Sequence, residues 1–215
     1  MIYLYSGTPG SGKSYCAAYK IYRGLNGKGN YICNFDINLE NASITFWSRI
    51  KRKFLKKPKL KYRKLGRFDY VKTYDLTPTY LKEYANKHHK RGKESQTTII
   101  IDECQLIWNS RTYSNKDRLP WIEFLSVHRH LGFDFILLTQ SDRLIDRQIR
   151  AFIEFEVKHR KLSNFGIKGK LLSLMMGGTV FGQISIWYGM REKVSFKILK
   201  YNKHIASLYD SYEIF

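Results

Sequence analysis

The chain has 215 residues, of which 43% are hydrophobic, enough for one domain with a buried core. Its formal net charge of +20 exceeds what solubility requires and indicates an anionic partner, such as nucleic acid or an acidic membrane surface. The three isolated cysteines include no CxxC pair and no histidine at ligand spacing, which argues against a cysteine metal site and fits a reducing cytosol.

The first 35 residues predict a strand, a glycine-rich loop, a helix and a second strand. An apolar run at residues 2–5 precedes the loop, and the helix begins after Lys13. A break rich in glycine and asparagine at residues 26–30 then leads to a strand at residues 31–35. This order is typical of a βαβ unit.

Residues 7–14 match the phosphate-loop pattern G-x-x-x-x-G-K-[ST] at every fixed position, between a strand and a helix as the pattern requires. The glycines let backbone N–H groups point at a phosphate, Lys13 would reach the β- and γ-phosphates, and the Ser14 hydroxyl would coordinate Mg²⁺. The alternative is a glycine turn beside a chance lysine. The expected ATP-binding residues are Gly7, Thr8, Pro9, Gly10, Ser11, Gly12, Lys13, Ser14 and Tyr15.

A strongly basic segment follows at residues 49–72, with twelve lysines and arginines against the single acid Asp69. Phe54, Leu55, Tyr62 and Phe68 are interleaved with these charges. The segment could follow the phosphates of single-stranded DNA and stack bases on its aromatic rings, or lie on anionic lipid headgroups. A solvated, charged loop is the third interpretation, and the sequence does not choose among them.

Two adjacent carboxylates end the next predicted strand. Thr77 and Pro78 open a helix that is expected to reach about residue 91, and a β-branched strand at residues 97–101 delivers Asp102 and Glu103. Behind a phosphate loop, Asp102 would hold Mg²⁺ and Glu103 would act as the general base that activates water. Taken alone, the pair would be only the exposed end of a strand.

A helix from Asp117 to residue 131 and a strand at residues 133–139 follow, and the strand ends next to Gln140. Gln140 could sense the γ-phosphate or orient water, or belong to a turn before Ser141, which is expected to cap a short helix. An arginine supplied in trans would stabilise charge on the γ-phosphoryl group. The candidates are Arg111, Arg143, Arg147 and Arg150.

The chain after residue 151 is expected to form short strands rather than helices. Residues 171–190 are uncharged and long enough to span a membrane, but they hold four glycines. A hairpin turning at Gly177-Gly178 is therefore the favoured interpretation, without a transmembrane helix.

We expect an α/β fold with a mostly parallel sheet flanked by helices. Residues 1–160 form its core with the basic insertion at 49–72, and 161–215 form a β-rich C-terminal extension of the same domain.

Three separated segments resemble the zonular occludens toxin (Zot) family, which contains the assembly ATPases of filamentous bacteriophages. They are the phosphate loop, the run IIIDECQLIW with the following Asn-Ser-Arg, and the run HRHLGFDFILLTQ, which leads into Ile149-Arg150-Ala151. The resemblance covers residues 1–160, and residues 207–210 also resemble the end of the family's cytoplasmic domain. Many members continue into a transmembrane segment. This chain is thus expected to be either a truncated cytoplasmic domain or a member that docks on the membrane differently.

The family resemblance implies an additional-strand P-loop fold and ATP hydrolysis that drives export of single-stranded phage DNA through the host inner membrane. Such proteins act as multimers on the cytoplasmic side of that membrane, alongside phage coat and packaging proteins. The resemblance implies that Lys13 and Ser14 bind the nucleotide, that Asp102 holds Mg²⁺ and that Glu103 activates water. Two alternatives stay open: a small-molecule kinase, against which the Asp102-Glu103 pair counts, and an assembly scaffold that binds nucleotide without turnover.

Overall fold

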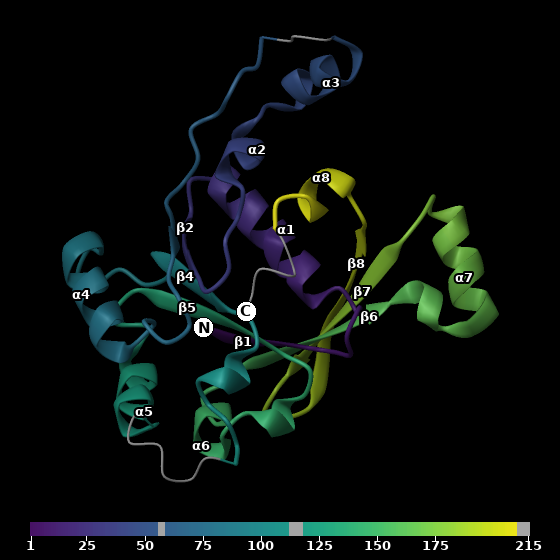
Figure 1. Cartoon of the computed structure of the whole chain (residues 1–215). Coiled ribbons are helices and arrows are strands. Elements are labelled where there is room, and N and C mark those ends of the chain that lie inside the picture. Colours follow the sequence, from purple (N-terminus) through teal and green to yellow (C-terminus); the bar gives the residue numbers. More distant parts are fainter. Residues whose placement is uncertain (56–58, 112–117, 210–215) are drawn as a thin grey trace.

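The computed structural model describes residues 1–55, 59–111 and 118–209 (Figure 1). Within these ranges eight strands form one sheet in the order β3-β2-β4-β5-β1-β6-β7-β8. The strands are β1 (Ile2–Ser6), β2 (Asn30–Cys33), β3 (Phe68–Tyr70), β4 (Thr97–Ile101), β5 (Phe133–Thr139), β6 (Phe155–Lys161), β7 (Val180–Trp187) and β8 (Glu192–Lys200).

Strands β1 to β6 pair in parallel, whereas β7 and β8 add an antiparallel hairpin to β6. This arrangement confirms the expected α/β class with a mostly parallel sheet. Strand β1 lies between β5 and β6, and β4 lies on the far side of β5. Because parallel strands present their carboxyl ends at one edge, the loops after β1, β4 and β5 meet there.

Helices cover both faces of the sheet (Figure 1). On one face, α4, α5 and α6 pack over a core that includes Phe124, Phe133 and Phe135. On the other, α1, α2 and α8 pack over a second core that includes Ile21, Ile100 and Ile136. The helices are α1 (Lys13–Asn26), α2 (Leu39–Ser43), α3 (Phe46–Phe54), α4 (Pro78–His88), α5 (Arg118–Val127), α6 (Arg147–Arg150), α7 (Gly166–Met175) and α8 (Lys203–Ala206).

Local sequence signals account for several helix boundaries. The Thr77 side chain accepts a hydrogen bond from the Tyr80 backbone N–H, and Pro78 stands in the first turn of α4, as expected. Helix α4 ends at His88, three residues before the expected end, and α5 ends at Val127 rather than at residue 131. The expected start of α5, Asp117, lies outside the described residues.

The predicted hairpin at Gly177-Gly178 is wrong. Residues 166–175 form α7, and Gly177, with a φ of 73°, ends the helix in the left-handed conformation. The Gly178 N–H donates to the Ser173 carbonyl, as at many helix C-termini. Residues 171–176 are rich in leucine and methionine, which favour a helix, and the two glycines stop that helix instead of turning a hairpin. The hairpin is formed by β7 and β8.

The short helix expected after Ser141 is two separate elements. Ser141 caps a 3₁₀ turn at Asp142–Leu144, and Asp146 caps α6, which carries Arg147 and Arg150. Asp146 is itself a strong helix-capping residue, so the chain starts a new helix there.

No helix in the part of the chain that the structure describes combines the length and the apolar character that crossing a membrane requires.

We predict that Phe124→Ala lowers the free energy of unfolding by about 3–5 kcal/mol, because it opens a cavity beside Phe133 and Phe135. Urea denaturation measures the change. Phe54→Ala is the matched control, since the Phe54 side chain is exposed, and it should cost less than about 0.5 kcal/mol. Equal losses in the two variants would contradict this assignment of the core.

Candidate functional site

The phosphate loop connects β1 to α1, and two of its glycines are in close contact with neighbouring strands. Gly12 has a φ of 94°, and a Cβ there would lie 2.4 Å from the ring of Phe181 in β7. A Cβ on Gly7 would lie 2.6 Å from the His159 carbonyl oxygen in β6. Side chains at these positions would force the loop off the sheet, so packing as well as backbone conformation requires glycine.

The Lys13 ammonium lies across this loop. Its Nζ donates to the Gly7 carbonyl at 2.7 Å and to the Thr8 carbonyl at 3.3 Å. Burial lowers the pKa of Lys13, while the carboxylates of Asp102 and Glu103 act in the opposite direction. The buried Ser11 hydroxyl has no hydrogen-bond partner among the described residues. The loop therefore presents a cation and a polar hydroxyl at the place where a phosphate would bind.

Ser14 and Asp102 meet directly at this edge of the sheet. The Ser14 hydroxyl donates to Oδ2 of Asp102 at 2.9 Å, although the two residues belong to α1 and the end of β4. Burial raises the pKa of Asp102, and hydrogen bonds from Ser14 and the Glu103 backbone partly offset this shift. A hydroxyl and a carboxylate are hard oxygen ligands, so the pair fits Mg²⁺ completed by phosphate oxygens and water.

Glu103 follows Asp102 in an unusual backbone conformation. Its φ of 48° is left-handed, which a residue with a side chain rarely adopts and which costs on the order of 1–3 kcal/mol. The Glu103 N–H donates to Oδ1 of Asp102 at 2.9 Å, and the Glu103 carboxylate accepts from the side chain of Gln105. The strained turn thus holds the two carboxyl groups together at the end of β4.

Asn34 is a site residue that the sequence analysis missed. Its side chain donates to the Asp102 carbonyl at 2.9 Å and accepts from the Asp102 N–H at 2.7 Å. Asn34 is buried just beyond β2, the strand next to β4. A polar residue directly after the apolar run at residues 31–33 was the available signal. This two-point clasp fixes the backbone that carries the Asp102 carboxylate.

Gln140 lies beside the start of the phosphate loop. It is exposed and lines a cavity of about 480 Å³ together with Gly7, Thr8 and residues of β6. None of the four proposed trans arginines is among the lining residues of this cavity; the described cations that line it are Lys158, Arg160 and Lys161. No motif in the sequence identifies these three residues, because they lie in an ordinary strand pattern.

The Tyr15 side chain points to a different partner than a nucleotide. Its hydroxyl donates to the Lys200 carbonyl at 3.1 Å and accepts from the Asn202 N–H at 2.8 Å, while its ring packs against Phe181 and Tyr201. These contacts join α1 to the C-terminal end of β8. A role of Tyr15 in nucleotide binding is thus confined to its backbone N–H in the first turn of α1.

Buried polar residues of β6 support the loop from the side. Glu156 is 4% exposed and accepts a hydrogen bond from the Ser6 hydroxyl at 2.6 Å. Arg191, from the turn between β7 and β8, lies 3.3 Å from the Glu156 carboxylate. His159 is almost fully buried, and this burial lowers its pKa to about 4. The C-terminal hairpin is therefore tied to the strand that precedes the phosphate loop.

We predict that Asn34→Ala lowers the free energy of unfolding by about 1–3 kcal/mol for each Asp102 backbone group left unpaired. Urea denaturation tests this loss. Asn30→Ala is the matched control at the other end of β2, where one hydrogen bond to the Gln96 carbonyl is removed far from the site. Equal losses in the two variants would contradict the special role of the clasp.

His159 should also make stability depend on pH. Because its folded pKa of about 4 lies below the ordinary 6.5, the unfolded chain binds a proton that the folded chain excludes. The free energy of unfolding should therefore fall as pH decreases from 6.5 to 4, by up to about 1.4 kcal/mol per unit for this group. Denaturation at several pH values should show a shallower fall in His159→Gln and an unchanged fall in the exposed-site control His130→Gln.

Comparison with known proteins places this geometry in a family. The model of the zonular occludens toxin (Zot) family matches residues 1–214. The Gene 1 protein of Salmonella phage IKe is 30% identical over 215 residues, which cover 96% of this chain and 51% of that protein. The Gene 1 protein of Enterobacteria phage fd is 28% identical over 179 residues, covering 82% and 47% respectively. The chain thus spans about half the length of these relatives.

Solved structures share the fold. The N-terminal domain of zonular occludens toxin from Neisseria meningitidis has a TM-score of 0.55 at 19% identity, covering 97% of this chain and 98% of that chain. The genome packaging NTPase B204 from Sulfolobus turreted icosahedral virus 2, in complex with ATP-gammaS, has a TM-score of 0.53 at 18% identity, covering 93% and 96%. These likenesses confirm the P-loop NTPase fold, and the chain belongs to the zonular occludens toxin (Zot) family.

Proposed function

We propose that this chain binds ATP with Mg²⁺ and hydrolyses it at the edge of the sheet where β1 and β4 end. The hydrogen bond between Ser14 and Asp102, beside the Lys13 ammonium, is the observation that carries the proposal. It brings the phosphate loop and the acidic strand end, which are 88 residues apart, into the arrangement that nucleotide hydrolysis needs.

Each residue has a role in this proposal. Residues 7–14 and the backbone of Tyr15 cradle the phosphates, and Lys13 neutralises charge on the β- and γ-phosphates. Ser14 and Asp102 would hold Mg²⁺, which supplies a further positive charge to the phosphate oxygens when it is bound. Glu103 accepts a proton from the attacking water, and Gln140, beside the loop, orients that water.

The biological role follows from the family and its named relatives. The matched phage proteins are called Gene 1 protein, and one structural neighbour is called a genome packaging NTPase. These names support a phage assembly NTPase. We propose that ATP turnover drives virion assembly and export of single-stranded DNA from the cytoplasmic side of the host inner membrane, with phage coat and packaging proteins as partners.

A homo-oligomer is part of the same proposal. A neighbouring copy would supply the trans arginine from Arg111, Arg143, Arg147 or Arg150, of which the first three are exposed. The Nε atom of Arg150 is buried and has no hydrogen-bond partner among the described residues. Arg150 is for this reason the one of the four that is least able to reach into another subunit.

Replacing Glu103 tests hydrolysis against the alternatives. Glu103→Gln should lower the rate of phosphate release about 10²–10⁴-fold and retain ATP binding, because only the general base is lost. Lys13→Ala should weaken ATP binding itself. Phosphate release and binding of a fluorescent ATP analogue are measured, with Glu123→Gln on the exposed side of α5 as the matched control.

The outcomes separate the three proposed functions. Free phosphate from the wild type, lost in Glu103→Gln, supports the ATPase. Phosphate found only on an added acceptor would indicate a kinase, and tight ATP binding without turnover in the assembled oligomer would indicate a scaffold. Phage release that is unchanged in Lys13→Ala and Glu103→Gln would contradict the role in assembly.

A further inference from the structure

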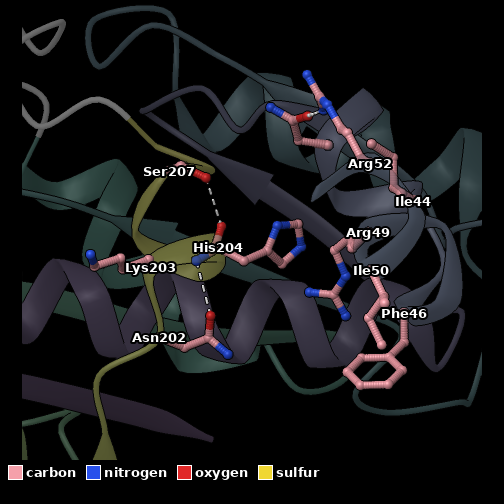
Figure 2. A pocket seen from close by; sticks show the side chains of 10 residues that line it. Ile44, Phe46, Arg49, Ile50, Arg52, Asn202, Lys203, His204 and Ser207 are labelled. Atoms are coloured by element: carbon pink, nitrogen blue, oxygen red, sulfur yellow. Dashed lines mark hydrogen bonds between the residues drawn. The ribbon is translucent and has the colours of Figure 1, made fainter. Parts of the chain in front are cut away.

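A second basic site lies away from the phosphate loop, in a pocket between α3 and α8 (Figure 2). The pocket has a volume of about 810 Å³. The residues that line it are Asn41, Ile44, Phe46, Arg49, Ile50, Arg52, Asn202, Lys203, His204 and Ser207. Three of them carry positive charge and none is acidic. Both walls come from acid-free sequence, since no aspartate or glutamate occurs at residues 41–68 or 193–209.

The polar side of the pocket is cationic, and Arg52 Nη1 donates to Oδ1 of Asn41 at 3.4 Å. Arg49 Nε and His204 Nε2 are buried and have no hydrogen-bond partner among the described residues. Figure 2 shows the Arg49 guanidinium and the His204 ring beside each other among the residues that line the pocket. The oxygen atoms of the polar walls are already engaged: Asn202 Oδ1 accepts from the His204 N–H at 2.9 Å, and the His204 carbonyl accepts from Ser207 at 2.9 Å. A ligand that brings acceptor oxygens and negative charge would match this wall.

The rest of the pocket is apolar. Ile44 and Ile50 contribute aliphatic surface, and the ring of Phe46 is 55% exposed at the edge of the site. The neighbouring Trp47 is 72% exposed. Aromatic rings beside a row of cations are the usual means by which proteins bind single strands, since bases stack on the rings while the cations contact the phosphates.

We propose that this pocket binds the phosphodiester backbone of single-stranded nucleic acid, with Arg49 and Arg52 on the phosphates and Phe46 against a base. This inference rests on the proposed function only where it identifies the bound nucleic acid as the one that the ATPase moves. Binding of nucleic acid in the pocket itself requires no ATP. It is favoured over a lipid surface for a geometric reason. Arg49, Arg52 and Lys203 line a concavity of about 810 Å³, which a flexible strand can enter and a flat bilayer cannot.

The pocket also contacts the helix that the phosphate loop opens. Helix α8 packs against α1: the His204 ring meets the Tyr22 ring edge-on at 5.6 Å, and the Asn202 N–H donates to the Tyr15 hydroxyl. Figure 1 shows α8 directly beside α1, with α3 projecting beyond α2. Helix α1 thus carries Lys13 and Ser14 of the proposed nucleotide site in its first turn and contacts two residues of the pocket wall through Tyr15 and Tyr22.

Strand binding is tested with the full chain and a fluorescein-labelled oligothymidylate of about 20 nucleotides, which is longer than the roughly 4–16 that one strand-binding module covers. Fluorescence anisotropy measures Kd. Arg49→Gln and Arg52→Gln should each raise Kd about tenfold, and each should reduce the slope of log K against log salt by about 0.7, the loss of one phosphate contact. Phe46→Ala should raise Kd at least about fivefold.

The control is Lys51→Gln, on the same helix and exposed but not part of the pocket wall. It removes the same charge, so it should raise Kd less than about threefold. An equal increase in Kd for Lys51→Gln and Arg49→Gln would overturn the proposal that the pocket binds the strand, because general electrostatic attraction to α3 would then explain binding. Thermal melting of each variant confirms that the chain is folded.

Two further measurements separate the remaining explanations. Sedimentation with phosphatidylcholine–phosphatidylserine vesicles should be unchanged by Arg49→Gln; vesicle binding that depends on Arg49 while strand binding does not would overturn the proposal in favour of a membrane. Lys13→Ala should keep full strand affinity. Normal ATP turnover in Lys13→Ala would contradict the proposed ATPase site. Weaker binding of the oligothymidylate by Arg49→Gln would still support nucleic-acid binding in the pocket.

Discussion

The hydrogen bond from Ser14 to Asp102 is the contact on which the site depends, because it joins the phosphate loop to the end of β4 across 88 residues of chain. It can form only if β1 and β4 run in the same direction and end at the same edge, with β5 between them. The parallel sheet provides that geometry. The two apolar cores on its faces hold the strands in register. The relative positions of Ser14 and Asp102 at the edge therefore depend on side chains that are buried far from them.

The environment of this hydrogen bond makes the ionisation of Asp102 and the backbone conformation of Glu103 energetically unfavourable. Burial raises the pKa of Asp102, and the φ of 48° at Glu103 stores backbone strain. Asn34 fixes the backbone at this position by pairing both the N–H and the carbonyl of Asp102. Strain and desolvation concentrated at one strand end, with a dedicated clasp, are typical of a functional site rather than of an ordinary turn.

The C-terminal part of the chain supports the phosphate loop rather than forming a separate unit beside it. Phe181 of β7 leaves no room for a side chain on Gly12, His159 of β6 does the same for Gly7, and Arg191 is paired with the buried Glu156. Helix α8 extends this support to α1 and forms one wall of the basic pocket. The proposed nucleotide site and the proposed strand site therefore both adjoin α1.

The sequence by itself determined the phosphate loop, the acidic strand end and the main strands and helices of the first 150 residues, because each depends on local spacing and periodicity. It did not predict α2, α3 or β3, which are short or lie within the strongly basic segment. It failed at residues 166–176, where glycines after a leucine-rich run end a helix rather than turn a hairpin. Only the tertiary structure decided that Asn34 clasps Asp102, that Tyr15 turns toward Lys200, and that Arg49 and His204 line one pocket. These contacts join residues far apart in the chain, and sheet order and packing, not local pattern, bring such residues together.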